Sequence, residues 1–136
     1  MTNWYKDVIE FHRAFGQRIG QQPALPETEE RNLRYLLLEE EFNEYEKAES
    51  ENNLVEIADA LADIIYIACG TAVSYGIPLD KIFEEVHRSN MAKLVDGKVL
   101  RREDGKVQKP EGWTAPDIVG ILEKQKETLH NAMITL

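Results

Sequence analysis

The chain has 136 residues, of which 43% are hydrophobic and 30% are charged, and its formal net charge is −9. This length suits one domain with a buried core, so we expect a single domain over residues 1–136. The acidic balance excludes a protein that is drawn to nucleic acid polymers by net positive charge, and the lone Cys69 excludes an internal disulfide framework.

Helical periodicity runs through most of the chain, and no segment shows the alternation of a half-buried strand. We expect helices from about Asn3 to Arg18, from about Glu29 to Ala48 with Thr28 as N-cap, from Asn52 or Asn53 to Tyr75, from Leu79 or Asp80 to Met91 or Lys93, and from about Thr114 to His130. The fold class is therefore predicted to be all-α, a bundle of about four to five helices.

Neither a signal peptide nor a membrane span is indicated by the sequence. The first 16 residues carry charges throughout, whereas a signal peptide needs an uninterrupted apolar core. The longest charge-free apolar stretch, Ile64–Leu79, is broken by glycine and proline and falls short of the ~20 residues that a spanning helix needs. We therefore expect a cytoplasmic protein without a membrane partner.

Between the fourth and last helices lies an irregular basic segment, residues 93–113, which we call the tongue. It holds two Asp-Gly turns and little periodicity, so short strands are an open alternative and a functional loop is the preferred interpretation. The region from His87 to Lys109 has seven basic and three acidic residues, whereas Glu27–Asp63 has three basic and thirteen acidic ones. An acidic half followed by a basic tongue suits a ligand that brings both a cation and phosphates, although two solvated faces would give the same counts.

Acidic residues of the second helix fall on a face that the periodicity predicts to be inward. The main apolar stripe of this helix is formed by Leu33, Leu36, Leu37 and Ala48. Glu40 and Glu44 lie inside the stripe, and Glu41 lies at its edge. Such positions are normally filled by apolar side chains, so these acids are candidates for a site.

The third helix is apolar almost all round, and its acids gather on one side. These acids are Glu56, Asp59 and Asp63, and no Lys, Arg or His lies between Lys47 and Lys81 to neutralise them. Two like charges ~4 Å apart repel by ~4 kcal/mol at an effective dielectric near 20. Such a cluster becomes protonated, pairs with cations from elsewhere in the fold, or binds a metal ion.

Structural and metal-binding interpretations of these acids are both open. In the structural one, the acids face solvent or pair with Arg31, Arg34 or the tongue. In the metal-binding one, a set of oxygen ligands favours Mg²⁺, for which Mn²⁺ can substitute, over zinc. A catalytically idle helical bundle that binds a protein partner would fit the structural interpretation.

A di-iron carboxylate protein is a further alternative, because such bundles use Glu-x-x-His pairs. The chain has two pairs with this spacing, Glu84 with His87 and Glu127 with His130. Glu84 and Glu127 point away from the apolar faces of their helices, which disfavours a shared inward site.

Four segments together resemble a known family. They are Glu40–Glu44 (EEFNE), which contains a Glu-x-x-Glu at Glu41 and Glu44, then EIADALADIIYIACGTA, EVHRSNMAKL and EDGKVQKPEGW. The ordered set resembles MazG-like and phosphoribosyl-ATP pyrophosphohydrolase-like domains of the all-α NTP pyrophosphatase superfamily, over about residues 11–121. The last two segments look like the tail of one MazG-like branch.

The resemblance implies a metal-dependent hydrolase that converts a nucleoside triphosphate to a monophosphate and pyrophosphate, with nucleotide-pool housecleaning as a role. It implies Mg²⁺ ligands among Glu41, Glu44, Asp63, Asp59 and Glu56. The family's second motif is Glu-x-x-Asp, and matching its Asp to Asp63 places Ala60 where the Glu is expected. Glu56 and Asp59 form a Glu-x-x-Asp one turn earlier, so the direct ligands on the third helix stay open.

The resemblance also implies roles for residues outside the metal set. Glu40 or Glu41 would orient or deprotonate the attacking water, as a carboxylate not fully used by metal can. The nucleotide would be contacted by Asn90, Lys93, Arg102, Lys109 and Trp113, the last as a stacking platform or as a packing anchor for the tongue. Family members build this site across subunits, so we expect a homodimer or a dimer of dimers.

Overall fold

In a computed structural model, the chain is all-α apart from one very small sheet, which confirms the predicted fold class. The structure describes residues 3–135, with side chains described as far as residue 127. The elements are α1 (Trp4–Phe15), α2 (Thr28–Ser50), α3 (Leu54–Tyr75), α4 (Leu79–Met91), β1 (Leu94–Val95), β2 (Lys98–Val99) and α5 (Ile118–Thr135).

The helix ends follow local capping chemistry. Helix α3 begins next to Asn53, where its start was predicted, and Asn53 caps it because its Oδ1 accepts a hydrogen bond from the Glu56 N–H at 3.2 Å. Several ends differ from the prediction, and the last helix begins at Ile118 rather than near Thr114. The first helix ends before Gly16, whose φ of 67° places it in the left-handed region, and the N-cap of α2 is Glu27 rather than Thr28.

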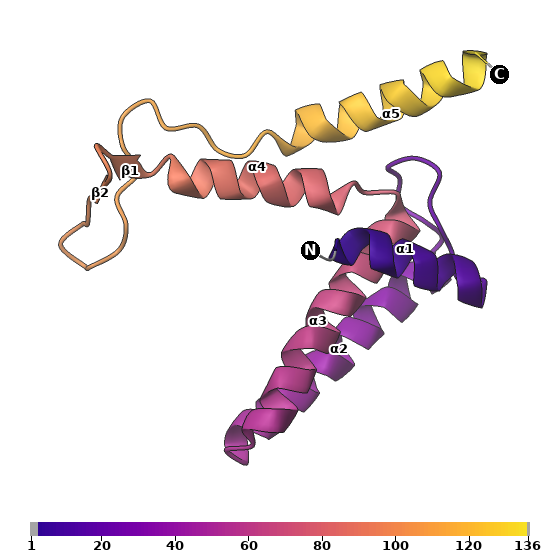
Figure 1. Cartoon of the computed structure of the whole chain (residues 1–136), viewed down its shortest axis with the longest axis horizontal. Coiled ribbons are helices and arrows are strands. Elements are labelled where there is room, and N and C mark those ends of the chain that lie inside the picture. Colours follow the sequence, from indigo (N-terminus) through magenta and orange to yellow (C-terminus); the bar gives the residue numbers. More distant parts are fainter. Residues whose placement is uncertain (1–2, 136) are drawn as a thin grey trace.

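Helices α1 and α2 both pack against α3, which is the central helix of the fold (Figure 1). The small core where α1 meets α3 contains Val8, Cys69 and Val73. By length and apolar composition alone, α3 could cross a membrane. The central helix of a soluble bundle has the same properties, and here two helices pack on α3.

Helix α4, the tongue and α5 form an arm that extends away from the α1–α3 unit (Figure 1). Helix α5 runs back along part of α4, and the two helices contact each other. The tongue lies at the far end of α4, well apart from the α2–α3 pair. The chain therefore places its acidic and basic halves in different parts of the molecule.

The inward face of α2 differs from the predicted one. Leu33 and Leu36 are 49% and 57% exposed, whereas Arg34 is 5% exposed and Leu37 is half-buried. The face toward α3 therefore includes Arg34, Leu37 and Ala48, and it is turned by about one residue from the predicted stripe. The prediction was wrong because α2 carries apolar side chains on several sides, and because a charged residue was not assigned to the core.

The tongue contains a short hairpin where the sequence predicted a loop. Leu94 pairs with Val99 and Val95 pairs with Lys98, in antiparallel register. Asp96 and Gly97 have φ values of 51° and 73°, so the turn has the backbone of a two-residue type I′ connection. The strands were missed because each is only two residues long, which is too short to show alternation.

Candidate active site

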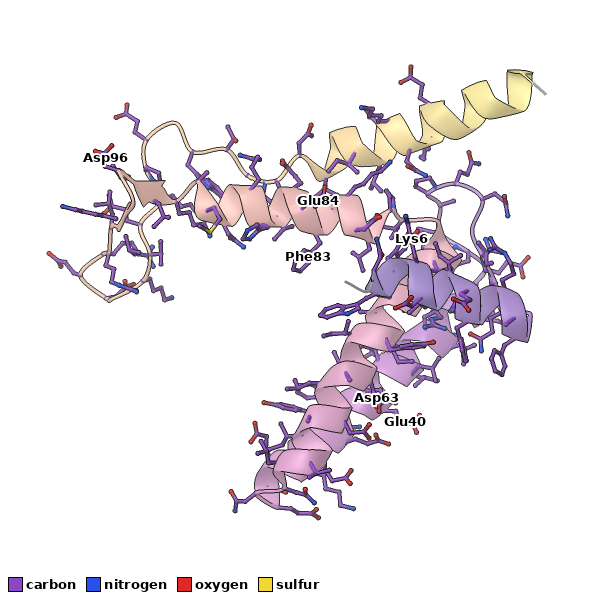
Figure 2. All side chains as sticks on the ribbon, viewed as in Figure 1. Lys6, Glu40, Asp63, Phe83, Glu84 and Asp96 are labelled. Carbon is purple, nitrogen blue, oxygen red and sulfur yellow. The ribbon has the colours of Figure 1, made fainter. Side chains whose placement is uncertain are left out.

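Three carboxylates from two helices meet where α2 packs on α3. Glu41 and Glu44 lie one turn apart on α2 and Asp63 lies on α3, and each offers an oxygen within 4.8 Å of the others. Glu41 and Asp63 are half-buried and Glu44 is exposed. We call these three residues the acid cluster. Figure 2 shows its position midway along the α2–α3 pair, where Asp63 is labelled.

The electrostatics of the cluster centre on Glu41. The pKa of Glu41 is raised to about 7, first by burial and then by the negative charges of Glu44 and Asp63. Burial and the charges of Asp59 and Glu44 also raise the pKa of Asp63. One oxygen of Glu41, Oε2, is buried and has no hydrogen-bond partner among the described residues. An unpartnered buried carboxylate oxygen is costly and is a ready ligand for a cation.

The other predicted acids lie around the cluster rather than within it. Glu56 and Asp59 line a cleft of about 460 Å³ between the end of α2 and the start of α3, and Glu44 lines it too. Glu40, which was predicted to lie on the inward stripe, is exposed, but its charge contributes to the raised pKa of Glu41. Glu41, predicted at the edge of that stripe, is the more buried of the two. Glu41 is half-buried in place of Glu40 because the inward face of α2 is turned by about one residue from the predicted one.

A buried cation that the sequence did not predict lies further along the same face of α2. Arg34 Nε donates to Thr71 Oγ1 at 3.2 Å, and its Nη2 donates to the Ile67 carbonyl at 3.1 Å. Burial lowers the pKa of this guanidinium. A Cβ at Gly70 would clash with it, so the glycine makes the room that Arg34 fills. Gly70, a glycine within the apolar helix α3, was the feature of the sequence that could have indicated the buried Arg34.

Cations do not neutralise the acid cluster within the described side chains. The ion pairs found there are Arg88 with Glu85 and Arg102 with Asp104, both remote from the cluster. Arg34 is held by neutral groups of α3, so the interpretation of the acids as partners of Arg34 or the tongue is not supported within one chain.

The predicted substrate residues gather at the end of α4, with one exception. Lys93 and Lys109 place their ammonium groups 5.5 and 4.8 Å from the ring centroid of Trp113. Lys93 Nζ also donates to Asn90 Oδ1 at 3.1 Å. Arg102 is the exception, because it pairs with Asp104 at 3.0 Å in the outer part of the tongue. We call Asn90, Lys93, Lys109 and Trp113 the tongue cluster.

A set of hydrogen bonds holds the end of the tongue against α4. Trp113 Nε1 donates to the Ser89 carbonyl at 2.7 Å, and Ser89 Oγ donates to the Thr114 carbonyl at 3.2 Å. Glu85 accepts from the Asp117 N–H at 2.7 Å, and the hydrogen bonds to Arg88 and Asp117 lower its pKa to about 2. Trp113 is therefore the packing anchor of the tongue in this structure.

The di-iron alternative finds no support in the described residues. Glu84 and His87 are both exposed on α4, and Glu84 lies far from Asp63 (Figure 2). Glu127 is exposed, and the side chain of His130 lies outside the described residues.

The sequence profile of the phosphoribosyl-ATP pyrophosphohydrolase family matches residues 8–90, which is more than half of the chain. The chain belongs to this family. The family is part of the MazG-like all-α NTP pyrophosphatase superfamily of enzymes, so the predicted resemblance is confirmed. Such enzymes act on phosphoric anhydrides and are typically dependent on a divalent metal.

A viral protein is similar to part of the chain. Protein L479 of Acanthamoeba polyphaga mimivirus, described as uncharacterized, is 40% identical over 80 residues, which make up 56% of this chain. The match spans only 32% of the viral protein, about a third of its length. The family match ends at Asn90, so most of the tongue cluster lies beyond it.

The acid cluster of this phosphoribosyl-ATP pyrophosphohydrolase family member fits a divalent metal ion. The fit rests on the buried, unpartnered Glu41 Oε2 and on a donor set made only of carboxylates. Glu41, Glu44 and Asp63 would hold the ion, and Ala60, which stands in place of the expected Glu, is buried beside the cleft and offers no ligand.

The raised pKa of Glu41 predicts an unusual pH dependence of stability in metal-free protein. An unfolded Glu titrates near 4.5 and the folded Glu41 near 7, so between these values the folded state binds more protons than the unfolded state. The free energy of unfolding in EDTA should therefore fall by roughly 1 kcal/mol between pH 5.5 and 7.5. Urea denaturation at both pH values measures this.

Glu41→Gln is the matched control for that measurement, because it removes the titrating group and keeps the side-chain size. Most of the pH difference should disappear in this variant. The low pKa of Glu85 acts only below pH 4.5, where stability falls as pH drops toward 2, so it does not interfere. A wild-type stability that rises between pH 5.5 and 7.5 would contradict the assignment.

Proposed function

We propose that the protein is a Mg²⁺-dependent nucleoside triphosphate pyrophosphohydrolase, which converts a (d)NTP and water to a (d)NMP and pyrophosphate. The single observation that carries the proposal is the acid cluster, in which Glu41 lies with two further carboxylates and has one buried oxygen without a hydrogen-bond partner. Membership of the family supports the reaction class. Mg²⁺, the triphosphate substrate and a role in nucleotide-pool housecleaning are the finer parts of the proposal.

The reaction can be assigned to groups of this chain. The oxygen of water forms a bond to the α-phosphorus, the bond from that phosphorus to the bridging oxygen breaks, and pyrophosphate leaves. A bound Mg²⁺ would neutralise phosphate charge and acidify a bound water. The exposed Glu40, which is not one of the three cluster carboxylates, is suited to accept the proton of the attacking water, and an oxygen of Glu41 that the metal leaves free is the second candidate.

The basic groups of the tongue would hold the triphosphate. Lys93 and Lys109 are brought to one place by the Trp113 ring, which gives two ammonium groups for phosphate oxygens. Asn90, hydrogen-bonded to Lys93, would contact the nucleotide next to these phosphates. Arg102 lies further out on the tongue than the two lysines, so among the groups of the substrate it would contact only the leaving pyrophosphate.

We propose further that the working enzyme is a homodimer or a dimer of dimers, with each site shared by two chains. In one chain the acid cluster and the tongue cluster lie well apart, on the α2–α3 pair and at the far end of the arm (Figure 1). A single nucleotide cannot bridge them there. A second copy that brings its tongue to the first copy's acid cluster would complete the site.

The exposed apolar surface supports a second copy as the partner. Among the described side chains, only seven hydrophobic residues are buried, and three of these are alanines. Large apolar side chains remain exposed on the helices, and these include Tyr35 at 67%, Phe42 at 55%, Val55 at 76% and Phe83 at 70%. Exposed large apolar side chains in this number, beside so small a core, favour an interface with another chain. Figure 2 shows Phe83 projecting from α4 on the side toward the α1–α3 unit.

Pyrophosphate release from a panel of ribo- and deoxynucleoside triphosphates tests the proposed function. With Mg²⁺ or Mn²⁺, at least one triphosphate should give monophosphate and pyrophosphate in equal amounts, and EDTA should abolish the release. A protein that is inactive on every nucleotide with either metal would favour the non-enzymatic bundle. Formation of diphosphate and inorganic phosphate would contradict the proposed bond cleavage.

A further inference from the structure

A pocket lies where the end of α4 meets the tongue, and its apolar side chains have none of the roles above. It has a volume of about 360 Å³ and is lined by Asn90, Met91, Lys93, Leu94, Val99 and Val107. This size is at the lower end of the range for small-molecule sites. Four apolar side chains and two polar ones therefore form a pocket with one mainly apolar wall and one polar edge.

The backbone of the tongue explains why the apolar side chains meet. Leu94 and Val99 are directly paired across the hairpin, so their side chains lie on the same face. Val107 comes from the outer part of the tongue, where it pairs with Arg101, and Gln108 N–H donates to the Leu100 carbonyl at 2.7 Å. The pocket is thus built by main-chain pairing within the tongue.

The polar edge of the pocket is continuous with the tongue cluster. Asn90 Oδ1 accepts from Lys93 Nζ at 3.1 Å, so the amide nitrogen of Asn90 is the group that remains to donate to a ligand. Lys93 lines the pocket and lies 5.5 Å from the Trp113 ring centroid, while Lys109 lies 4.8 Å from it. An apolar pocket therefore opens beside two cationic groups.

Trp113 cannot serve as the stacking platform for a base in this arrangement. Its indole N–H is bonded to the Ser89 carbonyl, and two ammonium groups lie over its ring. The base of a nucleotide whose phosphates meet these lysines must go elsewhere, and the apolar pocket is adjacent.

We propose that this pocket is the nucleobase subsite, with the base between the apolar side chains and Asn90 donating to an acceptor on its edge. A base has apolar faces and a polar edge, and it carries phosphates on one side, which matches the apolar wall, the amide and the neighbouring lysines. This proposal rests on the proposed function, because it takes the ligand to be a nucleotide.

The test compares two ligands that differ in the nucleoside. Calorimetry measures binding of a non-hydrolysable α,β-methylene nucleoside triphosphate and of inorganic tripolyphosphate, both with Mg²⁺. The double variant Val99→Thr/Val107→Thr keeps side-chain shape and removes two methyl groups from the pocket wall. It should weaken binding of the nucleotide analogue about tenfold and leave the tripolyphosphate affinity unchanged.

Two further variants separate the pocket from its surroundings. Val119→Thr makes the same change at a 68% exposed position of α5 and should alter neither affinity. Lys109→Ala should weaken both ligands by the same factor. An unchanged ratio of the two affinities in the double variant would overturn the proposal, even where nucleotides are hydrolysed. If the double variant instead changes the oligomeric state and keeps the ratio of the two affinities, the pocket is a contact between two copies of the chain. This result would also overturn the proposal.

Failure of the base-subsite proposal can be distinguished from failure of the proposed function. A selective loss of nucleotide affinity, in a protein that releases no pyrophosphate, would support the base subsite and refute the proposed reaction. Wild-type protein that binds neither ligand would overturn both.

Discussion

Replacing Asp63 with asparagine is expected to lower pyrophosphate release by about two to three orders of magnitude and to leave the metal-free protein at least as stable as wild type. The amide is nearly isosteric but a poor ligand for Mg²⁺, so metal-supported activity is lost. The burial of Asp63 and the nearby charges of Asp59 and Glu44 raise its pKa, so the charge that the substitution removes is an unfavourable one in the metal-free protein. Initial rates with Mg²⁺ and urea denaturation in EDTA measure the two effects.

Asp59→Asn is the matched control for Asp63→Asn. Asp59 is exposed and lines the cleft, whereas Asp63 is half-buried and belongs to the acid cluster. We expect Asp63→Asn to be the more damaging of the two changes. If Asp63 instead belonged to a structural ion pair, its loss would cost about 3–5 kcal/mol of stability. An Asp63→Asn protein that is much less stable in EDTA and still turns over nucleotides would refute its assignment as a ligand.

Mixing two inactive variants is expected to restore activity if the site is shared between chains. One variant is Asp63→Asn and the other is the double variant Lys93→Ala/Lys109→Ala, which should bind nucleotide weakly. When both are produced together in equal amounts, half of the dimers are mixed, and each mixed dimer has one intact site of two. Activity at low nucleotide concentration should therefore recover to about a quarter of wild type.

The two variants produced separately and combined only at assay, without subunit exchange, provide the control for this recovery. Activity that stays at the sum of the parents after co-production would show that the acids and lysines of one site come from one chain. Such a result would contradict the shared site and leave the acid cluster as a metal site intact. A purely monomeric protein in solution would have the same consequence.

The helices of this protein could be predicted well because their signals are local. Asn53 as a cap, Gly76 as a left-handed helix end, and long apolar periodicity in α3 each depend on neighbours in the sequence. The meeting of Glu41, Glu44 and Asp63 could also be predicted, as members of a set, because the three residues fall on facing turns of two successive helices.

The rotation of α2 could not be predicted, because it depends on tertiary contacts. Apolar side chains occupy several sides of α2, and Leu33 and Leu36 gave a stripe that does not face α3. The face that does includes Arg34, whose burial depends on hydrogen bonds to α3 and on the space at Gly70. The exchange of Glu40 and Glu41 follows from this one error.

The tongue was the least predictable segment for a related reason. Its strands have two residues each and its anchor, Trp113, is fixed by a hydrogen bond to Ser89, 24 residues earlier in the chain. The sequence alone gave Trp113 two equal interpretations, a stacking platform or a packing anchor. The hydrogen bond to Ser89 and the contacts with Lys93 and Lys109 distinguish them.

Calorimetric titration of Mg²⁺ into the metal-free protein tests the central claim most directly, with and without a non-hydrolysable nucleotide analogue. Because Glu41 titrates near pH 7, binding at that pH should release a fraction of a proton, visible as a dependence of the heat on buffer ionisation. We expect saturable binding that Asp63→Asn abolishes and Asp59→Asn largely keeps. Wild-type protein that binds no Mg²⁺ or Mn²⁺ under either condition would contradict the assignment of the acid cluster as the metal centre.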